Sequence, residues 1–287
     1  MGFYDVRKIT YQQKGEDAVN DKTRYEIMKN RELLKGYHAE DAGAEETDQQ
    51  QKLPSIPCLL ARKGTDTIKL PADYASLSFT GNIMELISGR ESRRNYADLP
   101  LTLLELSFLL WSTQGVRRFA GHKNPVTFRN VPSAGSRHTF ETFLFVNQVD
   151  GLKKGIYHYL PQEHELEFWD DRSDFEEELT DALCGQRFAA SAPVLFVWAS
   201  IPYRMEWRYG QKAAKYLLID AGHVCENLYL ACESIGCGTC AVGAYDQDRM
   251  DDLLGFPPGP SADKNYICTV YAAPVGRKIP TADSEME

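Results

Sequence analysis

The chain has 287 residues, of which 43% are hydrophobic and 25% charged, and its formal net charge at pH 7 is −9. This length and composition exclude a wholly disordered chain and allow a large domain with a substantial core. The acidic balance argues against a nucleic-acid partner, and no apolar run approaches the roughly 18 residues that a membrane span requires. Seven cysteines, with no secretory apolar run near the first residue, predict reduced thiols in a cytoplasmic protein.

The first part of the chain differs from the rest in composition and in the spacing of its apolar residues. Residues 23–37 carry apolar side chains at helical spacing and predict one amphipathic helix. Residues 38–52 are acidic and glutamine-rich without periodicity, and predict a solvated linker. Prolines then separate short extended pieces between residues 54 and 71. We therefore expect residues 1–80 to form an arm with an acidic linker, lying on a main domain of residues 81–287.

Two helices at the start of the main domain are predicted by the same local signal. Asn82 and Thr102 are each followed three residues later by a glutamate, Glu85 or Glu105, which is the pattern of a capping box. The apolar face after Thr102 ends at Gly115, where the second helix is expected to stop.

A strand and a hairpin follow these helices. Residues 142–149 alternate in the manner of a strand and are rich in aromatic and β-branched side chains. Residues 155–161 and 164–170 predict two strands paired around a turn. These three segments supply the first part of a sheet.

Two further helices enclose a buried strand. Residues 174–185 predict a helix capped by Asp174, and the continuous apolar run at 192–200 predicts a central strand. Residues 211–235 carry the longest helical signal, with apolar side chains following the i, i+3, i+4, i+7 rule almost without gaps. Gly236 stands where a left-handed residue ends a helix.

The last part of the chain contains short elements. Residues 239–245 predict a short strand or extended loop, residues 251–257 a helical turn, and residues 266–276 a closing strand. Strands interspersed with helices, one hairpin and no repeat period together predict an α+β sandwich.

The segment after the longest helix contains two overlapping motifs. Gly236, Gly238 and Ala241 spell G-x-G-x-x-A, and Cys237 and Cys240 spell C-x-x-C. A dinucleotide fingerprint needs a strand before it and a helix after it. The predicted order here is the reverse, so we assign Gly236 to helix termination and reject the dinucleotide interpretation.

Four cysteines lie close together in this part of the sequence. Cys225 and Cys232 fall on the apolar face of the long helix, where a free cysteine behaves as a small hydrophobic side chain. No second C-x-x-C occurs at zinc-finger spacing. The spacing therefore favours buried structural thiols and no metal, with a Cys237–Cys240 redox pair or an irregular metal site as alternatives.

One segment is basic within the acidic chain. Between residues 84 and 137 there are eight Lys or Arg residues against four Asp or Glu, a local balance of +4. Arg90, Ser92 and Arg94 alternate in sequence, so an extended backbone points their side chains the same way. Guanidinium groups match phosphate geometry, so this segment is a candidate anion site; a solvated surface of arginines is the alternative.

Several short motifs occur together in a fixed order. They are GRESRRNY from residue 89, PSAG from residue 132, GIYHY from residue 155, DAGH from residue 220 and PVGR from residue 274. In this order the sequence resembles the nitroreductase superfamily of flavoproteins, and within it most closely the SagB-type, azoline oxidase-like branch. The resemblance covers about residues 80–280.

The resemblance implies a fold, a cofactor and a set of site residues. The fold would be a nitroreductase-like sandwich, a central mixed or antiparallel sheet flanked by helices, in an intertwined homodimer that binds FMN in its crevice. The basic residues and serine of the first motif would bind the phosphate and ribityl chain, together with a late basic residue. The small residues of PSAG would let the backbone approach the cofactor, and the segment after the long helix would aim main-chain N–H groups at flavin N5. The residues so assigned are Arg90, Ser92, Arg94, Arg277 (or Lys278 if the alignment shifts by one), Ser133, Gly135, Gly243 and Ala244.

The substrate side is less completely matched. The branch carries a Lys-Tyr pair before the long helix, whereas this sequence has Arg208 and Tyr209. Arginine stays protonated at neutral pH and cannot serve as a general base, so Tyr209 is the catalytic candidate. Lys212 and Lys215 are alternatives, and His138 is expected to begin a strand.

These observations predict a cytoplasmic, homodimeric, FMN-dependent oxidoreductase. It would transfer a hydride or two electrons between a donor, with NAD(P)H as a candidate, and a small organic or peptide-derived substrate. Three alternatives stay open: an azoline-to-azole peptide dehydrogenase of SagB type, a non-catalytic flavin-binding or cofactor-free partner subunit, and a metal-binding protein that uses its cysteines.

Overall fold

The computed structural model describes residues 21–36, 46–122 and 125–279. The chain divides into two compact units, residues 1–44 and residues 45–287. Most of the predicted acidic linker, and the first 20 residues, lie outside the described residues. The division of the chain at residue 80 stays a prediction.

The first unit contains the helix predicted near the N-terminus. Helix α1 spans Asp21–Asn30 and is followed by the 3-10 turn η2 at Arg31–Leu34. The side chains of Tyr25 and Met28 are both more than 60% exposed, so the apolar side of this helix is not covered within its own unit.

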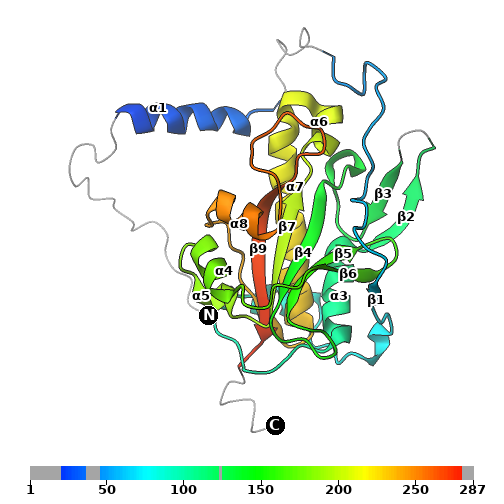
Figure 1. Ribbon diagram of the computed structural model, residues 1–287, viewed down its shortest axis with the longest axis vertical. Helices are drawn as coiled ribbons and strands as arrows, with labels where there is room; N and C mark the ends of the chain where they lie inside the picture. Colours follow the sequence, from blue (N-terminus) through cyan, green and yellow to red (C-terminus); the bar gives the residue numbers. More distant parts are fainter. Residues whose placement is uncertain (1–20, 37–45, 123–124, 280–287) are drawn as a thin grey trace. The chain divides into compact units, whose positions relative to one another are not determined.

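The second unit is built on one antiparallel sheet (Figure 1). Its seven strands in the described residues have the order β1-β6-β5-β4-β7-β9-β8, and every neighbouring pair is antiparallel. The strands are β1 (Thr67–Lys69), β4 (Phe140–Val146), β5 (Gly155–Leu160), β6 (Glu165–Asp170), β7 (Val194–Ser200), β8 (Cys237–Thr239) and β9 (Cys268–Arg277). The predicted α+β fold with a central antiparallel sheet is confirmed.

Helices cover both faces of the sheet. One face packs against α3 (Leu103–Gln114) and α7 (Ala213–Ser234), and the other against α4 (Glu176–Ala182), α5 (Arg187–Ala190) and α8 (Gln247–Leu253). The remaining elements are α2 (Ile83–Gly89), α6 (Tyr203–Tyr209), the hairpin of β2 (Val116–Ala120) and β3 (Val126–Arg129), and the 3-10 turns η4 (Tyr74–Ser76), η5 (Ala134–Ser136) and η6 (Gly210–Lys212).

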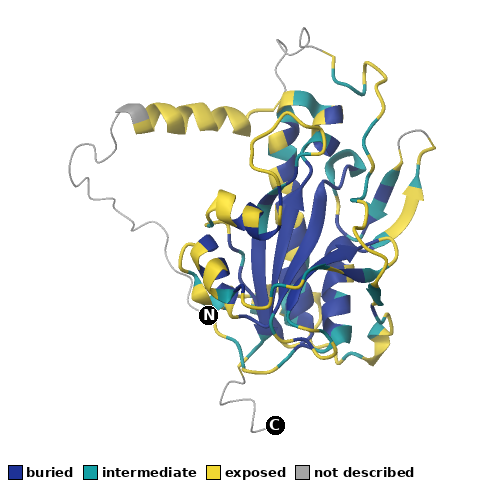
Figure 2. Cartoon of the chain, in the orientation of Figure 1, coloured by how far each residue is buried: buried dark blue, intermediate teal, exposed yellow. Residues whose placement is uncertain are grey.

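Side-chain alternation divides the central strands between two cores. In β7, Phe196 and Trp198 face the α3 and α7 core, whereas Leu195 and Val197 face the opposite core. Both sets are almost completely buried, and the middle of the sheet is buried throughout in Figure 2. This explains why residues 192–200 form a continuous apolar run.

Capping motifs and a terminating glycine in the sequence correctly predicted several helix ends. Both capping boxes are present, Asn82 with Glu85 and Thr102 with Glu105. Gly236 follows α7 with φ of +71°, as a left-handed helix terminator should. The prediction for Asp174 was wrong: α4 begins at Glu176, Phe175 occupies the N-cap, and no side chain caps the helix.

Three elements carried no clear sequence signal: the hairpin β2–β3 and the short helices α5 and α6. Helix α8 begins at Gln247, four residues before the helical turn predicted at 251–257. No helix in the part of the chain that the structure describes is long and apolar enough to cross a membrane.

A chain of five buried charged side chains lies beside the β4–β6 part of the sheet. Glu141 forms an ion pair with Arg204 at 2.7 Å and faces His158, whose Nδ1 is 2.7 Å from Glu167. Arg129 bonds to the main-chain oxygen of Phe140 at 3.1 Å, next to Glu141. All five are at most 4% exposed. Burial at this level is tolerated because each charge has an opposite charge or a hydrogen-bond partner.

The buried charges fasten a segment that precedes the sheet. We call residues 47–64 the strap. Leu60 N–H donates to Glu141 at 2.8 Å and Lys63 N–H donates to Glu167 at 2.7 Å. The oxygen of Pro57 accepts from Arg204 Nε at 3.0 Å. The ion chain therefore supplies acceptors and donors for strap backbone that has no strand partner.

We expect Glu141→Gln to lower the free energy of unfolding and to change its pH dependence. Burial opposes ionisation of Glu141, but Arg204 and His158 outweigh it and lower the pKa from 4.5 to about 2. A pKa lowered by folding contributes stability above the unfolded value, and that stability is lost as pH falls from 4.5 towards 2. Its size is on the order of 3 kcal/mol. Urea unfolding between pH 2.5 and 7 should show this component in the native chain and not in the variant. The exposed Glu163→Gln serves as control, and an E141Q variant as stable as E163Q would contradict the expectation.

Candidate functional site

The predicted anion-binding segment crosses the edge formed by β8 and β9. Arg93 N–H donates to the oxygen of Thr239 at 2.9 Å, and Ala97 N–H donates to the oxygen of Arg277 at 3.0 Å. A Cβ added at Gly238 would lie 2.7 Å from Arg93 Cδ, so only glycine lets the segment pass this closely. The glycine-rich stretch after α7 thus has a packing role that its motif did not reveal.

One tyrosine joins this segment to the long helix. Tyr229 of α7 lies beneath the Arg90 guanidinium, 5.2 Å from the ring centre, and its hydroxyl is 2.8 Å from the hydroxyl of Ser92. The same hydroxyl accepts a hydrogen bond from Ala241 N–H at 2.8 Å. Arg90, Ser92 and the segment after β8 are therefore brought together by Tyr229, a residue that the sequence analysis missed because it reads as one more apolar helix position.

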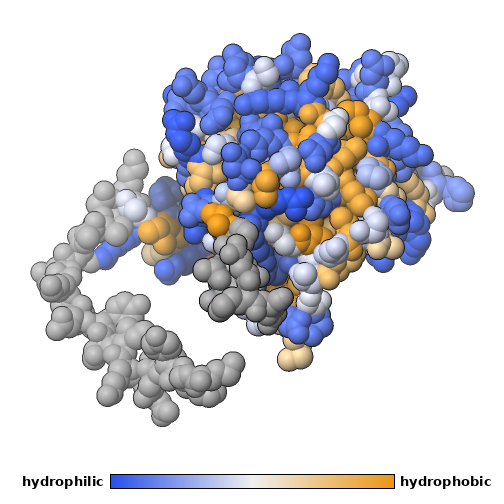
Figure 3. Space-filling view, turned by 90° about the horizontal axis from the view of Figure 1, so that it is seen from below, coloured by the Kyte–Doolittle hydropathy of each residue, from blue (hydrophilic) through white to orange (hydrophobic). Residues whose placement is uncertain are grey.

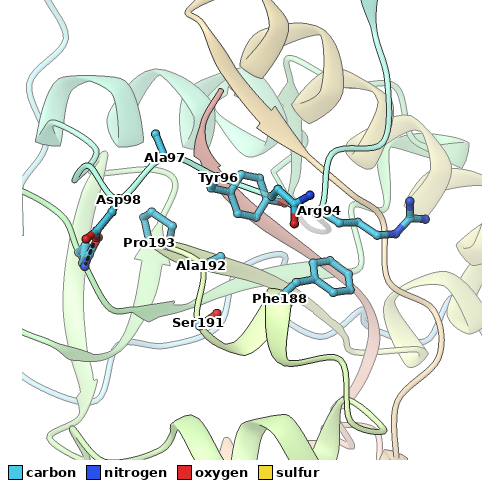
Figure 4. Close-up of a pocket in the computed structure, with 10 residues that line it drawn as sticks. Arg94, Tyr96, Ala97, Asp98, Phe188, Ser191, Ala192 and Pro193 are labelled. Carbon is cyan, nitrogen blue, oxygen red and sulfur yellow. Dashed lines mark hydrogen bonds between the residues drawn. The ribbon is translucent and has the colours of Figure 1, made fainter. Parts of the chain in front are cut away.

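Arg94 lies on a different side of the segment from Tyr229. It lines a hollow of about 300 Å³ together with Tyr96, Asp98 and Phe188. Figure 4 shows Arg94 and Phe188 at one end of this pocket and Asp98 at the other. No carboxylate pairs with Arg90 or Arg94 among the residues that the structure describes.

The late basic residues are held by acidic partners. Arg277 donates from Nε to the oxygen of Pro100 at 3.0 Å and from Nη2 to Glu105 at 2.8 Å. Lys278 pairs with Glu233. The Nη1 amino group of Arg277 has no partner in the described residues, so Arg277 keeps hydrogen-bond donors for a ligand. The ammonium group of Lys278, in contrast, is already paired with Glu233.

Gly243 and Ala244 follow the bridge that Val242 makes with Ala272. Both are exposed, and neither N–H finds an acceptor within the described part of the chain. The Ala244 oxygen accepts from Gln186 at 2.7 Å, which fixes the orientation of that peptide. Two consecutive main-chain donors are thus without acceptors in the described residues, and the Val242–Ala272 bridge fixes the peptide that carries the first of them.

The PSAG turn is anchored on the middle of α7. Ala134 N–H donates to Asp220 Oδ1 at 3.1 Å, and the Ser133 hydroxyl accepts from His138 N–H at 2.9 Å. Asp220 is buried, and burial raises the pKa of its carboxyl group. Its second oxygen, Oδ2, is buried without a hydrogen-bond partner in the described residues. The DAGH motif therefore positions the PSAG turn.

Gly135 brings this turn against the end of α6. It adopts φ of +57°, and a methyl group added there would lie 2.7 Å from the Tyr209 hydroxyl and 2.9 Å from Arg208 Nε. Arg137 Nε donates to the Gly135 oxygen at 3.2 Å. The catalytic candidate Tyr209 is thus next to a predicted cofactor-binding residue, although 74 positions separate them in sequence.

His138 does not begin a strand as expected. It has φ of +42° and lies in the turn before β4, which starts at Phe140. It is 5% exposed, and burial together with the charges of Arg129 and Arg137 lowers its pKa to about 2. His138 is therefore a neutral side chain of the turn.

The two groups of site residues contact opposite faces of α7. Asp220 holds the PSAG turn and Tyr229 holds Arg90 and Ser92. Nine residues separate these two anchors, which is two and a half turns of an α-helix and about 13 Å along its axis. Within one chain, the PSAG turn and the arginine segment therefore do not line the same cleft.

The cysteines of the C-x-x-C motif are free thiols buried between α7 and β8. Burial raises the pKa of Cys237 to about 12, which suppresses the thiolate that redox chemistry needs. The described residues contain no cluster of three or more His, Cys, Asp or Glu that could hold a metal ion.

Comparisons with known proteins identify the family of this chain. The profile of the Nitroreductase family matches residues 87–276. A protein of Methanocaldococcus jannaschii, MJ1384, provisionally named a nitroreductase, is 33% identical over 195 residues, which are 68% of this chain and 90% of that protein. The chain belongs to the nitroreductase family.

More distant relatives share the fold over much of the chain. The trifolitoxin-processing protein TfxB of Rhizobium leguminosarum bv. trifolii is 24% identical over 168 residues, 57% of this chain and 44% of TfxB. A structure from Anabaena variabilis, provisionally named a nitroreductase, matches with a TM-score of 0.56 and 25% identity over 73% of this chain and 40% of that one. The E. coli microcin synthetase McbBCD with truncated pro-MccB17 bound matches with a TM-score of 0.54 and 17% identity over 91% of this chain and 95% of that one. The chain thus spans less than half of TfxB and of the Anabaena structure.

Members of the nitroreductase family are generally FMN-dependent oxidoreductases, and the residues present here fit an FMN. Arg90 and Arg94 are cations without a carboxylate partner in the described residues, which suits a phosphate dianion. Gly243 and Ala244 offer N–H groups without acceptors in the described residues, while two carboxylates lie near the cations: Asp98 lines the hollow of Arg94, and Glu105 bonds to Arg277.

We expect Gly135→Ala to be more destabilising than Gly151→Ala. Both glycines adopt a left-handed conformation, which costs a side-chain residue about 1–2 kcal/mol. A methyl group at Gly151 meets open space, whereas one at Gly135 meets Tyr209 and Arg208. Urea unfolding should therefore show a free energy of unfolding at least about 1 kcal/mol lower for G135A than for G151A. Equal values would mean that the PSAG turn is not packed against α6.

Proposed function

We propose that this protein is an FMN-dependent oxidoreductase that passes a hydride or two electrons between a donor and a small organic or peptide-derived substrate. The observation that carries the proposal is the pair of arginines without carboxylate partners in the described residues, Arg90 and Arg94. Their segment bonds to Thr239 and Arg277 and is joined through Tyr229 to Ala241, two residues before Gly243. Because the donor remains to be identified, NAD(P)H is proposed as a candidate only.

The phosphate end of the cofactor would be held by three basic residues. Arg90 stands on Tyr229, and Arg277 retains its Nη1 donors while Glu105 fixes its position. Arg94 lines a different hollow, contrary to the predicted common direction of Arg90, Ser92 and Arg94, and would have to turn its side chain to reach the same phosphate. Ser92 shares a hydrogen bond with the Tyr229 hydroxyl and has capacity left for a ribityl hydroxyl. Several donors in one place are what a phosphate dianion requires.

The ring end would meet the main chain of Gly243 and Ala244. When bound, FMN would supply the two-electron chemistry. N–H groups that are already oriented stabilise negative charge at small reorganisation cost. Gly243 has no side chain there, so the backbone itself can approach a flat ring closely.

Tyr209 is proposed as the catalytic residue on the substrate side. Its hydroxyl lies against Gly135 of the PSAG turn, and its ring packs on Tyr216 of α7 with centres 4.7 Å apart. This packing fixes the position of a hydroxyl that could hold or move a proton at a reacting substrate atom. Ser133 and Gly135 would approach the ring from the same turn.

The site would be completed by a second copy of the chain. The PSAG turn and the arginine segment lie on opposite faces of α7, so one copy would supply the turn and the other the arginines. Five large apolar side chains of α2 and α7 are between 46% and 78% exposed, and apolar side chains also gather on the face shown in Figure 3. They are Ile83, Met84, Ile87, Leu218 and Ile219.

A second candidate function is azoline-to-azole peptide dehydrogenation of the SagB type. It is favoured by the similarity to TfxB, which is named for processing trifolitoxin. Arg208 stands in the position of the lysine that the resemblance would require, so Tyr209 would have to act without that base. A third candidate is a non-catalytic flavin-binding subunit of a larger assembly, in which Tyr209 would have no proton to move. For all three candidates we keep the cytoplasmic location predicted from the sequence as part of the proposal.

FMN binding is the first test. Purified protein reconstituted with FMN should show flavin absorbance that bleaches on anaerobic addition of NADH or NADPH if either is the donor. Arg90→Gln should raise the Kd for FMN at least about tenfold, because a charge-assisted bond to phosphate is lost. Fluorescence titration measures the Kd, and the exposed Arg187→Gln is the matched control. Failure of the native chain to bind FMN would refute the proposal.

The dimer has its own test. Leu218→Glu should give a monomer by size-exclusion chromatography with light scattering, because a charge is placed on the proposed interface. FMN affinity should fall at the same time, since the turn and the arginines no longer share a site. Leu99→Glu changes an equally exposed leucine elsewhere and should leave both properties intact. A monomeric native chain with full FMN affinity would rule out the shared site.

A further inference from the structure

Next to the PSAG turn lies Arg137, whose positive charge has no carboxylate partner in the described residues. The Arg137 side chain is 8% exposed, its guanidinium is 5.2 Å from the centre of the Trp207 ring, and its Nε donates to the Gly135 oxygen. Its two terminal amino groups have neither a hydrogen bond nor an ion pair within the described residues. A buried guanidinium normally finds a carboxylate, as Arg204 does with Glu141 at 2.7 Å.

A second arginine lies against the same turn. Arg208 is exposed, and its Nε and Cδ would each be 2.9 Å from a methyl group at Gly135. Its guanidinium is 5.6 Å from the Tyr209 ring and is likewise without a carboxylate in the described residues. Burial, and next the positive charge of Arg208, lower the pKa of Arg137.

The neighbouring groups do not cancel this charge. Asp220 accepts from the Ala134 N–H through Oδ1, its Oδ2 makes no hydrogen bond in the described residues, and it is not among the groups that shift the pKa of Arg137. His138 is neutral, and the strap adds Cys58 on the far side of Arg137. Two like charges held together without an anion are unfavourable, in a protein whose net charge of −9 offers many acids. A ligand that supplies the missing negative charge would remove this repulsion.

We propose that Arg137 and Arg208 form an anion-binding site beside Tyr209, which selects substrates or donors that carry a carboxylate or phosphate. This inference rests on the proposed function for its biological meaning, but the site itself needs no flavin. The hollow between Arg137 and the strap measures about 10 Å³, room for one water molecule at most. The anion must therefore approach from the exposed side of Arg208, where its other end can reach the Tyr209 hydroxyl.

The test uses two ligands of the same shape and different charge, 4-nitrobenzoate and 4-nitrobenzamide. Isothermal titration calorimetry on the full chain, with and without FMN, should show tighter binding of the carboxylate. Arg208→Gln should weaken the carboxylate at least about tenfold and leave the amide unchanged, because one charge-assisted bond is lost. Arg208→Lys should keep part of the preference, since it retains the charge without the planar fork. Arg187→Gln, an exposed arginine of α5, should change neither ligand.

The flavin reduction potential separates substrate recognition from an effect on the cofactor. Selective loss of the carboxylate in R208Q at unchanged potential supports the proposal. Equal loss of both ligands, or a lowered potential with no change in ligand preference, overturns it. If the chain binds no FMN, the calorimetry on the flavin-free protein still decides the anion site, so the two failures are distinguishable. Arg137→Lys provides a second variant, and thermal unfolding of each variant shows that it is folded.

Discussion

The pairing of charges is the constraint on which this structure depends. The cations that hold the fold together have acidic partners: Arg204 has Glu141, Arg277 has Glu105 and Lys278 has Glu233. Four other arginines of the candidate sites, Arg90, Arg94, Arg137 and Arg208, have no carboxylate partner among the described residues, although the protein has more acids than bases. A charge left unpaired in a folded protein costs free energy, so it persists where another molecule supplies the counterion. The site can therefore be located by the arginines that the protein leaves without partners.

Helix α7 divides these unpaired arginines into two groups. Tyr229 holds Arg90 on one face, and Asp220 holds the turn that carries Arg137 on the other. The separation of nine residues along the helix determines this division, because any multiple of a whole turn would have placed both groups on one face. Each chain holds its own PSAG turn and its own arginine segment, but on opposite faces of α7. A cofactor site that uses both would therefore need the turn of one chain and the arginines of another.

The fold could be predicted from the sequence because its signals are local. Capping boxes, the alternation of β7 and the long apolar stripe of α7 each specify an element without knowledge of the rest. The hairpin β2–β3 and α6 could not be found, because their burial depends on segments distant in sequence. Trp207 of α6, for example, is buried by strap residues more than 150 positions earlier, with its Nε1 donating to the Leu53 oxygen at 2.9 Å.

Candidate site residues could be proposed from the sequence where motifs contain them, but not where folding alone brings residues together. Arg90, Ser92 and Gly135 were identified from motifs, whereas Tyr229 and Arg137 have the residue types of a helix core and a surface turn. Nothing in the sequence says that a tyrosine nine positions after Asp220 will bond to Ser92, because that contact is made by folding alone. Asp174 failed as a cap for the related reason that a favourable residue type does not impose the backbone geometry that capping requires.

The strap links the part of the chain outside the family match to the substrate side of the site. The family profile begins at residue 87, yet the strap bonds to α6 at several points. Gln49 N–H donates to the Trp207 oxygen at 2.9 Å, and Arg204 holds the Pro57 oxygen while its own charge is held by Glu141. Tyr209 and Arg208 stand at the end of this helix, against Gly135. Burying charged side chains costs desolvation free energy, so such a chain adds little net stability. It does determine which groups lie together, because each charge accepts only a partner of the right sign and geometry. Here that specificity fixes one helix and, with it, the two side chains that face the PSAG turn.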